Sequence, residues 1–536
     1  MRGCFIACIL TICAAPAWGT CPEEVAQAPY TGQSLWAAEP EHDTLDPQTL
    51  SDLDMHTLLL AEWNRALTAL GRQRFGWLAE HPYLDVAAVR ERQEAVRELR
   101  SEDPLSQRLR EIFKADGARI DHAAEDLFCE TSSTKFDLDL YVMGGMSCTM
   151  TGALLAFGLS TGQASMALLP LYPLAMFGRA EVYQARVRDR LLSYRDGLHA
   201  AQSIARVITA SKSALLQQHG QHLNALLHSP EIRGLAPNLE KLWSLGAARP
   251  LNLVYQHSLW SLRTTLAQLR AARPALQKVW SLLGEMDALG TLAQLGKDST
   301  IEWKFPALVD SPETSLEIVN GHNPFIALKS PGTSVANSAR LGFSTPHPNF
   351  SILTGQNMGG KSTYLKMIAL TALLAQMGAP VPAEAVHLTP LSIRSHVNVT
   401  DSIAAGKSYY EAESELLLKL VQHAQEHPKT LLILDEILIG TNPSEREAAV
   451  KATASYLSKR GGIYVLAIHD VGVGDLEDTH PRVENRHVEE QLDAGRLTFS
   501  YRVLNGVTRH RNAITVLQIK GFPEEIIQDA RRFLRE

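Results

Sequence analysis

The sequence predicts a multidomain α plus α/β protein, in which a helical part precedes an α/β part. From Leu50 to about residue 130, and again over residues 180 to about 300, apolar residues recur at three- and four-residue spacing. From about Ile301 the chain changes to short β-rich runs separated by Pro and Gly turns. In this last part a glycine-rich loop lies between an apolar strand and a helix, the order that a phosphate-binding α/β domain requires.

Composition is that of an ordinary multidomain globular chain. The 536 residues are 45% apolar and 20% charged, enough to form several buried cores. A net charge of −7 argues against a strongly basic nucleic-acid-binding protein, although a local basic groove is compatible with it. Four of the six cysteines lie in the first 21 residues, so the body has no disulfide framework and fits a reducing compartment. No Cys/His spacing indicates a zinc site.

The first 20 residues have the pattern of a secretory signal peptide or membrane anchor. They contain one arginine, then an uncharged run with small residues at Ala15, Ala17 and Gly19. A disordered or misassigned start of translation is the alternative. Residues 21–45 contain Pro and Glu and are expected to form a linker.

Residues 140–178 form an unusual segment without a single charged residue. The segment is long enough for two short membrane spans joined by a turn near residues 160–163. A buried helical hairpin explains it equally well. Arginines follow it from Arg179 onwards, whereas Asp137 and Asp139 precede it, which favours the cytosolic side for the chain that follows. The expected location is the cytoplasmic face, with association to an inner membrane through this hairpin.

The most specific motif is G-x-x-x-x-G-K-S, from Gly355 to Ser362, the Walker A or P-loop pattern. It lies between the apolar strand "FSIL" and a helix that ends at Gly378. Backbone N–H groups of such a loop surround phosphate oxygens at a helix N-terminus, Lys361 places its charge on the β- and γ-phosphates, and Ser362 offers a hydroxyl to Mg²⁺. The predicted nucleotide-binding residues here are Gly355, Asn357, Met358, Gly359, Gly360, Lys361, Ser362 and Thr363.

Two further strands end in polar residues. "TLLILDE" places Asp435 and Glu436 at the carboxyl end of a buried strand, where ligands bind in parallel α/β sheets. Asp435 is expected to hold Mg²⁺, mainly through water, and Glu436 to polarise the attacking water. "GIYVLAIHD" ends at His469 and Asp470, and His469 is expected to sense the γ-phosphate, although a lone histidine is more often structural.

Together, "TGQNMGGKSTYLK", "LLILDEILIGTNPSER" and "VLAIHD" resemble the MutS family, the DNA mismatch-repair ATPases. "GKSYYEAESELLLKL" is similar to the segment that the family has between its two Walker motifs. "NGVTRHRNAITVLQIKGFPEEIIQDARRFL" is similar to the helical unit that pairs subunits. The resemblance covers about residues 43–536 and is most specific from Asn349 to Asp470.

This resemblance implies a helical lever domain over residues 46–300, interrupted at 140–178, and an ABC-like, MutS-type P-loop ATPase domain over 301–536 with a C-terminal dimerisation unit. It implies a homodimer, ATP and Mg²⁺ as cofactors, and ATP hydrolysis. The stretch ahead of the lever-like helices is too short for a mismatch-recognition domain. Any DNA binding is therefore expected to be weak and not mismatch-specific.

The resemblance also implies that each site is completed by the neighbouring subunit, with Ser408 reaching the partner's γ-phosphate. A helix N-cap is the structural alternative for Ser408. Two other functions stay open at this point. A membrane-attached transporter-type ATPase shares the P-loop, but its Leu-Ser-Gly-Gly-Gln signature is absent. A nucleotide-gated scaffold that does not hydrolyse ATP has no need of Glu436.

Overall fold

The chain divides into two compact units by its internal packing. Unit 1 contains Ala66–Arg74 and Glu102–Ala288, and unit 2 contains Ala38–Arg65, Phe75–Ser101 and Leu289–Glu536. This division differs from the predicted boundary near residue 301, because three segments that precede the boundary, 38–65, 75–101 and 289–300, pack within unit 2. The computed structural model describes residues 40–55, 63–101, 103–128, 191–244, 257–343, 346–356, 359–397, 409–493, 496–507, 514, 517–518 and 520–533.

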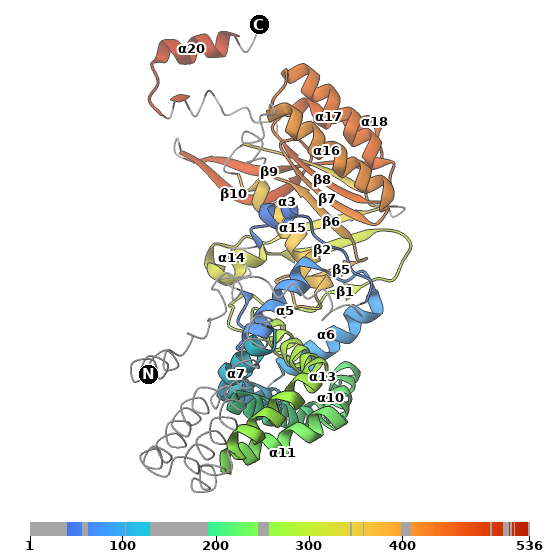
Figure 1. The fold of residues 1–536 in the computed structure, drawn as a ribbon. Coiled ribbons are helices and arrows are strands. Elements are labelled where there is room, and N and C mark those ends of the chain that lie inside the picture. Colours follow the sequence, from blue (N-terminus) through green and yellow to red (C-terminus); the bar gives the residue numbers. More distant parts are fainter. Residues whose placement is uncertain are drawn as a thin grey trace, which may run out of the picture. The chain divides into compact units, whose positions relative to one another are not determined.

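Unit 1 is helical (Figure 1). Helix α5 (Ala69–Glu80) contributes residues to both units. The other labelled helices with residues in unit 1 are α7 (Pro104–Phe128), α10 (Ala214–Leu227), α11 (Pro230–Ser244) and α13 (His257–Gln294), and residues 191–209 are helical as well.

Trp280 of α13 organises the core of unit 1. Its side chain is fully buried and its indole N–H donates to the Ile120 carbonyl at 3.1 Å, so burying this polar group costs little. The Tyr194 ring meets it edge-on, with 6.0 Å between centroids. At Gly197 a Cβ atom would lie 2.9 Å from the Trp280 ring. Glycine therefore lets the helix that carries residue 197 approach the indole closely.

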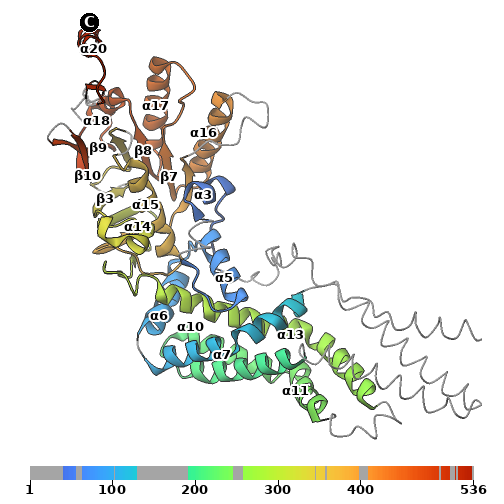
Figure 2. The same cartoon turned by 90° about the vertical axis from the view of Figure 1, so that its left-hand side faces the viewer.

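Unit 2 contains two sheets and the helices that cover them (Figure 2). The smaller sheet has the order β1-β5-β2-β3 and the larger one the order β10-β9-β4-β8-β7-β6. The strands are β1 (Ala307–Leu308), β2 (Ser315–Gly321), β3 (Asn337–Gly342), β4 (Phe350–Thr354), β5 (Ala385–Leu388), β6 (Ser392–His396), β7 (Thr430–Asp435), β8 (Ile463–Ile468), β9 (Val483–Asp493) and β10 (Arg496–Asn505). The helices are α3 (Pro47–Asp52), α6 (Val86–Arg100), α14 (Pro324–Lys329), η4 (Pro331–Thr333), α15 (Lys361–Gln376), α16 (Tyr409–Glu426), α17 (Pro443–Ser458), η6 (Val471–Asp475), α18 (Leu476–Thr479) and α20 (Glu524–Phe533).

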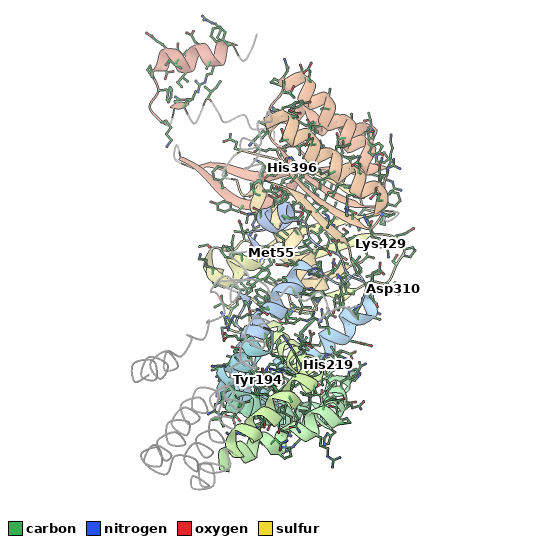
Figure 3. The ribbon with its side chains drawn as sticks, viewed as in Figure 1. Met55, Tyr194, His219, Asp310, His396 and Lys429 are labelled. Carbon is green, nitrogen blue, oxygen red and sulfur yellow. The ribbon has the colours of Figure 1, made fainter. Side chains whose placement is uncertain are left out.

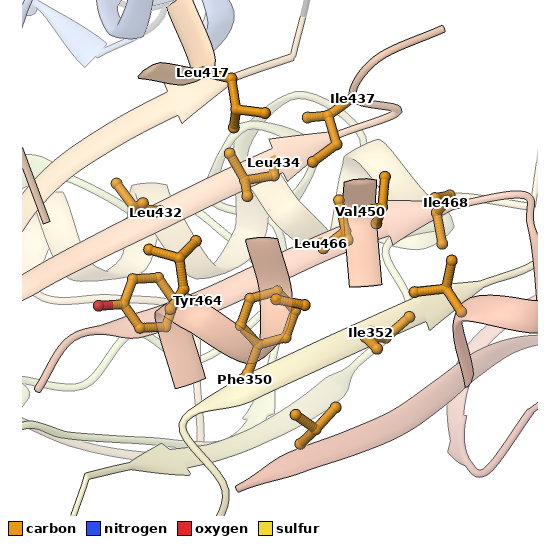
Figure 4. Close-up of a cluster of buried hydrophobic side chains, with 14 of the residues drawn as sticks. Phe350, Ile352, Leu417, Leu432, Leu434, Ile437, Val450, Tyr464, Leu466 and Ile468 are labelled. Carbon is orange, nitrogen blue, oxygen red and sulfur yellow. The ribbon is translucent and has the colours of Figure 1, made fainter. Parts of the chain in front are cut away.

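The larger sheet is parallel except at β10, which runs antiparallel to β9. Helix α15 lies on one face, whereas α16 and α17 cover the other (Figure 2). Strands β4, β7 and β8 are buried along their whole length, which explains why they are continuous apolar runs and not alternating ones. On the α16 and α17 face, side chains such as Phe350, Leu434, Val450 and Leu466 form one apolar cluster (Figure 4).

The edge strand β6 is capped by side chains from residues 43–52. Its outward backbone N–H groups belong to alternate residues: Ile393 donates to Asp43 at 3.1 Å, Ser395 to Thr49 Oγ1 at 3.0 Å, and Val397 to Asp52 at 2.9 Å. These acceptors stand where a neighbouring strand would supply carbonyls. The segment predicted to be the end of a linker and the start of a lever domain thus completes the hydrogen bonding of the larger sheet of unit 2.

Asp43 also forms an ion pair with Arg394, with Nη1 2.8 Å from Oδ2, and both side chains are largely buried. Burial opposes ionisation of Asp43, but the hydrogen bond and charge of Arg394 outweigh it, so its pKa lies below the ordinary value. The ionised carboxylate therefore stabilises unit 2 above the ordinary pKa of 3.8, and this contribution is lost as the pH falls through the folded-state pKa.

We expect Asp43→Ala to lower the free energy of unfolding of unit 2 by roughly 3 kcal/mol at neutral pH, because it leaves Arg394 and a backbone N–H buried without their acceptor. The measurement is urea denaturation. Asp310→Ala, which removes an exposed aspartate of the same unit, is the matched control (Figure 3). A loss no larger than that of the control would show that the capping carboxylate does not stabilise the sheet edge.

Within the described ranges, no helix is both long and apolar enough to span a membrane. Residues 1–20 and 140–178, for which the signal-like segment and the hairpin were predicted, lie outside the described residues.

Candidate functional site

The phosphate loop joins β4 to α15, as the motif requires. Gly355 has φ 148° and Gly360 has φ 93°, and Gly360 occupies the N-cap position of α15. Such backbone angles favour glycine. A Cβ atom at Gly360 would also lie 3.1 Å from the Tyr501 ring, and one at Gly359 would lie 3.1 Å from the Gln356 carbonyl. The backbone angles and close contacts of the loop thus explain why glycines occupy these positions of the motif. Asn357 and Met358 lie outside the described residues.

Lys361 is buried at the start of α15, with 5% of its surface exposed. Its ammonium donates to the carbonyl oxygens of Gly355 at 2.9 Å and Gln356 at 3.3 Å, and lies 3.3 Å from His469 Nε2. A buried cation at a helix N-terminus, beside a loop of backbone amides, is a binding site for phosphate.

Ser362 and Asp435 form the next contact. The Ser362 hydroxyl donates to Asp435 Oδ2 at 2.6 Å. Asp435 Oδ1 is buried and has no hydrogen-bond partner among the described residues. Burial, only partly offset by the Ser362 hydrogen bond, raises the pKa of this carboxyl. A serine hydroxyl beside a carboxylate with an unpartnered oxygen fits a hard cation such as Mg²⁺, which prefers oxygen ligands.

Glu436 and His469 form a second pair, with His469 Nε2 2.6 Å from Glu436 Oε1. About a third of each side chain is exposed, 35% for His469 and 31% for Glu436, so water can reach the carboxylate. Glu436 has φ 50°, an uncommon angle for a residue with a side chain, and such strain is concentrated at functional sites.

Strand register brings these residues together. β8 pairs in parallel with β4, opposing Thr354 to Ile468, and with β7, opposing Asp435 to Ala467. The three strands therefore end at one edge of the sheet, and their following residues are the phosphate loop, Glu436 and His469. The carboxyl edge of a parallel sheet is where α/β proteins bind ligands.

Residues 351–536 match the family model of MutS domain V. This match supports MutS-family membership for the part of the chain that contains the site. Domain V is the ATPase domain of MutS-family proteins, and the matched range contains Lys361, Asp435, Glu436 and His469.

The sequence motifs, with the family resemblance for Ser408, predicted nine nucleotide-binding residues and four catalytic or metal-binding roles in this domain. The structure gathers Gly355, Gly359, Gly360, Lys361, Ser362, Asp435, Glu436 and His469 at one edge of the sheet. Thr363 lies on α15 and, like Gly360, lines a neighbouring cavity. Ser408 lies outside the described residues.

A cavity of about 240 Å³ beside the phosphate loop was not predicted from the sequence. Its lining includes Gly360 and Thr363 of the loop and helix, Asn337 of β3 and Tyr501 of β10. Tyr501 has φ 57°, and the Asn337 side chain holds the strand there by donating to the Tyr501 carbonyl at 3.0 Å and accepting from the Val503 N–H at 2.8 Å. No local motif marks these residues, since each contact joins distant parts of the chain.

A second unpredicted contact follows His469. Asp470 accepts two hydrogen bonds from the Arg446 guanidinium, at 2.8 and 2.9 Å. This paired geometry fixes the chain directly after the histidine against α17. The motif "VLAIHD" contains Asp470, but its partner Arg446 lies on helix α17.

We expect Lys361→Ala to weaken binding of a fluorescent ATP analogue at least about tenfold, whether or not Mg²⁺ is present, because it removes the buried cation. Asp435→Asn should weaken binding only in the presence of Mg²⁺, because the amide keeps an oxygen but not the charge that attracts the cation. Lys419→Ala, at an exposed lysine of α16, is the control. Equal effects of Asp435→Asn with and without Mg²⁺ would contradict the metal assignment.

Proposed function

We propose that this MutS-family protein binds ATP with Mg²⁺ and hydrolyses it. The observation that carries the proposal is the spacing of five side chains at one sheet edge: Lys361 lies 3.3 Å from His469, which lies 2.6 Å from Glu436, while Ser362 lies 2.6 Å from Asp435. A cation for phosphate, an oxygen pair for a metal, and a carboxylate for water are the groups that phosphoryl transfer to water requires.

Each group has a separate task in this proposal. Lys361 and the backbone amides of the loop bind the phosphates, and Ser362 and Asp435 hold Mg²⁺, which neutralises charge on the phosphate oxygens. Glu436 accepts a hydrogen bond from the attacking water and orients it. His469 contacts both Lys361 and Glu436, so it is placed to sense whether the phosphate is present. The cavity lined by Thr363 and Tyr501 is large enough for part of a nucleotide and lies on the side of Gly360.

The Glu436–His469 pair favours hydrolysis over a nucleotide-gated scaffold. A protein that only binds ATP has no need of a strained, water-accessible carboxylate beside its phosphate loop.

The test of hydrolysis is phosphate release by the purified protein. Glu436→Gln should lower kcat roughly 100-fold and leave ATP affinity nearly unchanged, because the amide cannot accept the proton of water but leaves Lys361 in place. Glu426→Gln, at an exposed glutamate of α16, is the matched control. Wild-type turnover by Glu436→Gln would refute the role of Glu436, and no phosphate release by the unaltered protein would refute the proposed activity.

We further propose a homodimer in which Ser408 completes the partner's site, and a weak association with DNA. Both proposals rest on the resemblance to the MutS family. Ser408 itself is not among the described residues. DNA binding is expected to be weak because the net charge is −7. It is expected to depend steeply on salt and to ignore mismatches, because the contacts would be to the phosphate backbone. Fluorescence anisotropy with matched and mismatched duplexes at two salt concentrations measures this. A clear preference for the mismatched duplex would contradict it.

A further inference from the structure

The loop that follows Glu436 is held in an unfavourable conformation. Glu436 has φ 50° and Leu438 has φ 61°, both in the left-handed region that side chains other than glycine rarely adopt. Such residues persist only where the surrounding structure enforces their conformation. The contacts that hold residues 437–440 therefore also determine where the Glu436 carboxylate points.

Apolar packing supplies the first part of this restraint. Ile437 and Leu438 are 1% and 5% exposed in the cluster on the α16 and α17 face (Figure 4). Gly440 packs against the start of α16, where an added Cβ would lie 3.0 Å from Tyr410 Cβ. Ile439, in contrast, leaves 44% of its surface exposed, so its side chain does not anchor the loop.

Glu413 supplies the restraint at Ile439. Its Oε1 accepts the Ile439 backbone N–H at 3.2 Å. Glu413 lies on α16 and is completely buried, and its Oε2 has no hydrogen-bond partner within the described part of the chain. Its charge also acts on His396, a buried residue at the end of β6, and partly offsets the lowering of the pKa of that imidazole by burial (Figure 3).

A buried carboxylate with only one oxygen satisfied is costly for folding. An apolar residue at this helical position would pack among Leu417 and its neighbours without that cost. Among the described residues, the hydrogen-bond partner of Glu413 is the Ile439 backbone N–H of the strained loop, three residues after Glu436. The cost of burying Glu413 is therefore explained if its hydrogen bond with Ile439 keeps Glu436 in position.

We propose that Glu413 is a positioning residue, which holds the 437–440 loop against α16 and thereby keeps Glu436 aligned for hydrolysis. This inference rests on the proposed ATPase activity. The hydrogen bond that Glu413 accepts comes from the loop after Glu436 and not from a phosphate-binding residue. Its loss should consequently affect the chemical step and not the binding of nucleotide, because misalignment of a reacting group by about 1 Å can slow a reaction on the order of 100-fold.

The experiment compares three variants of the full-length protein. Glu413→Ala removes the acceptor and should lower kcat roughly 10- to 100-fold with KM for ATP within about twofold. Glu413→Gln keeps an acceptor oxygen and should restore kcat to within about threefold of the unaltered protein. Glu415→Ala, which removes an exposed carboxylate from the same helix, is the control. ATP-analogue binding by each variant shows that the phosphate loop is folded.

Hydrogen exchange adds a readout that does not depend on turnover. The amide of Ile439 should exchange faster in Glu413→Ala than in the unaltered protein, and Glu413→Gln should keep its protection. Unchanged kcat or unchanged exchange in Glu413→Ala would overturn the positioning role and leave the ATPase proposal standing. A rise in KM by the same factor as the fall in kcat would also overturn the positioning role. Absence of hydrolysis by the unaltered protein would overturn both.

Discussion

The parallel pairing of β8 with β4 on one side and β7 on the other is the constraint on which the candidate site depends. Because these three strands share a register, the loop after each one emerges at the same edge of the sheet. The strands themselves can lie in the centre only because both faces are covered, by α15 on one and by α16 and α17 on the other. Apolar packing thus sets the distances between charged groups that lie far apart in the chain.

The site combines a buried charge with stored backbone strain. Lys361 is almost inaccessible, and its ammonium is satisfied by two loop carbonyls while it faces His469. Glu436 keeps an uncommon backbone angle beside it. A phosphate entering the loop would compete for the Lys361 donors, and His469 links that event to Glu436. This arrangement offers a short physical path from the occupant of the loop to the carboxylate that is proposed to polarise water.

Residues 43–52 belong to unit 2, although they lie far in the sequence from the strand that they cap. Side chains of Asp43, Thr49 and Asp52 take the place of a neighbouring strand at the edge strand β6. An open sheet edge is a template for unwanted pairing, and three side-chain acceptors at alternate positions remove that template. Unit 2 is therefore built from chain segments on both sides of residues 102–288, and it is not simply the C-terminal half of the sequence.

The sequence by itself determined the features that depend on elements adjacent in the chain. A strand, a glycine-rich loop and a helix follow each other directly, so the positions of Gly355, Gly360, Lys361 and Ser362 could be predicted from their spacing. Asp435, Glu436 and His469 could be placed at strand ends because a buried strand is a continuous apolar run, and parallel strands present their carboxyl ends to ligands.

Only the tertiary structure decided the pairings. The contacts of Ser362 with Asp435, of Asp43 with Arg394 and of Glu413 with Ile439 join segments whose separation no local pattern encodes. Glu413 sits among other acidic residues in a helix, and nothing in its spacing distinguishes it from exposed Glu415. Segment 43–52 lacks any strand pattern because its side chains, and not its backbone, meet the sheet. Such partners are selected by packing in three dimensions, since a hydrogen-bond acceptor carries no signal in the sequence for the donor it will find.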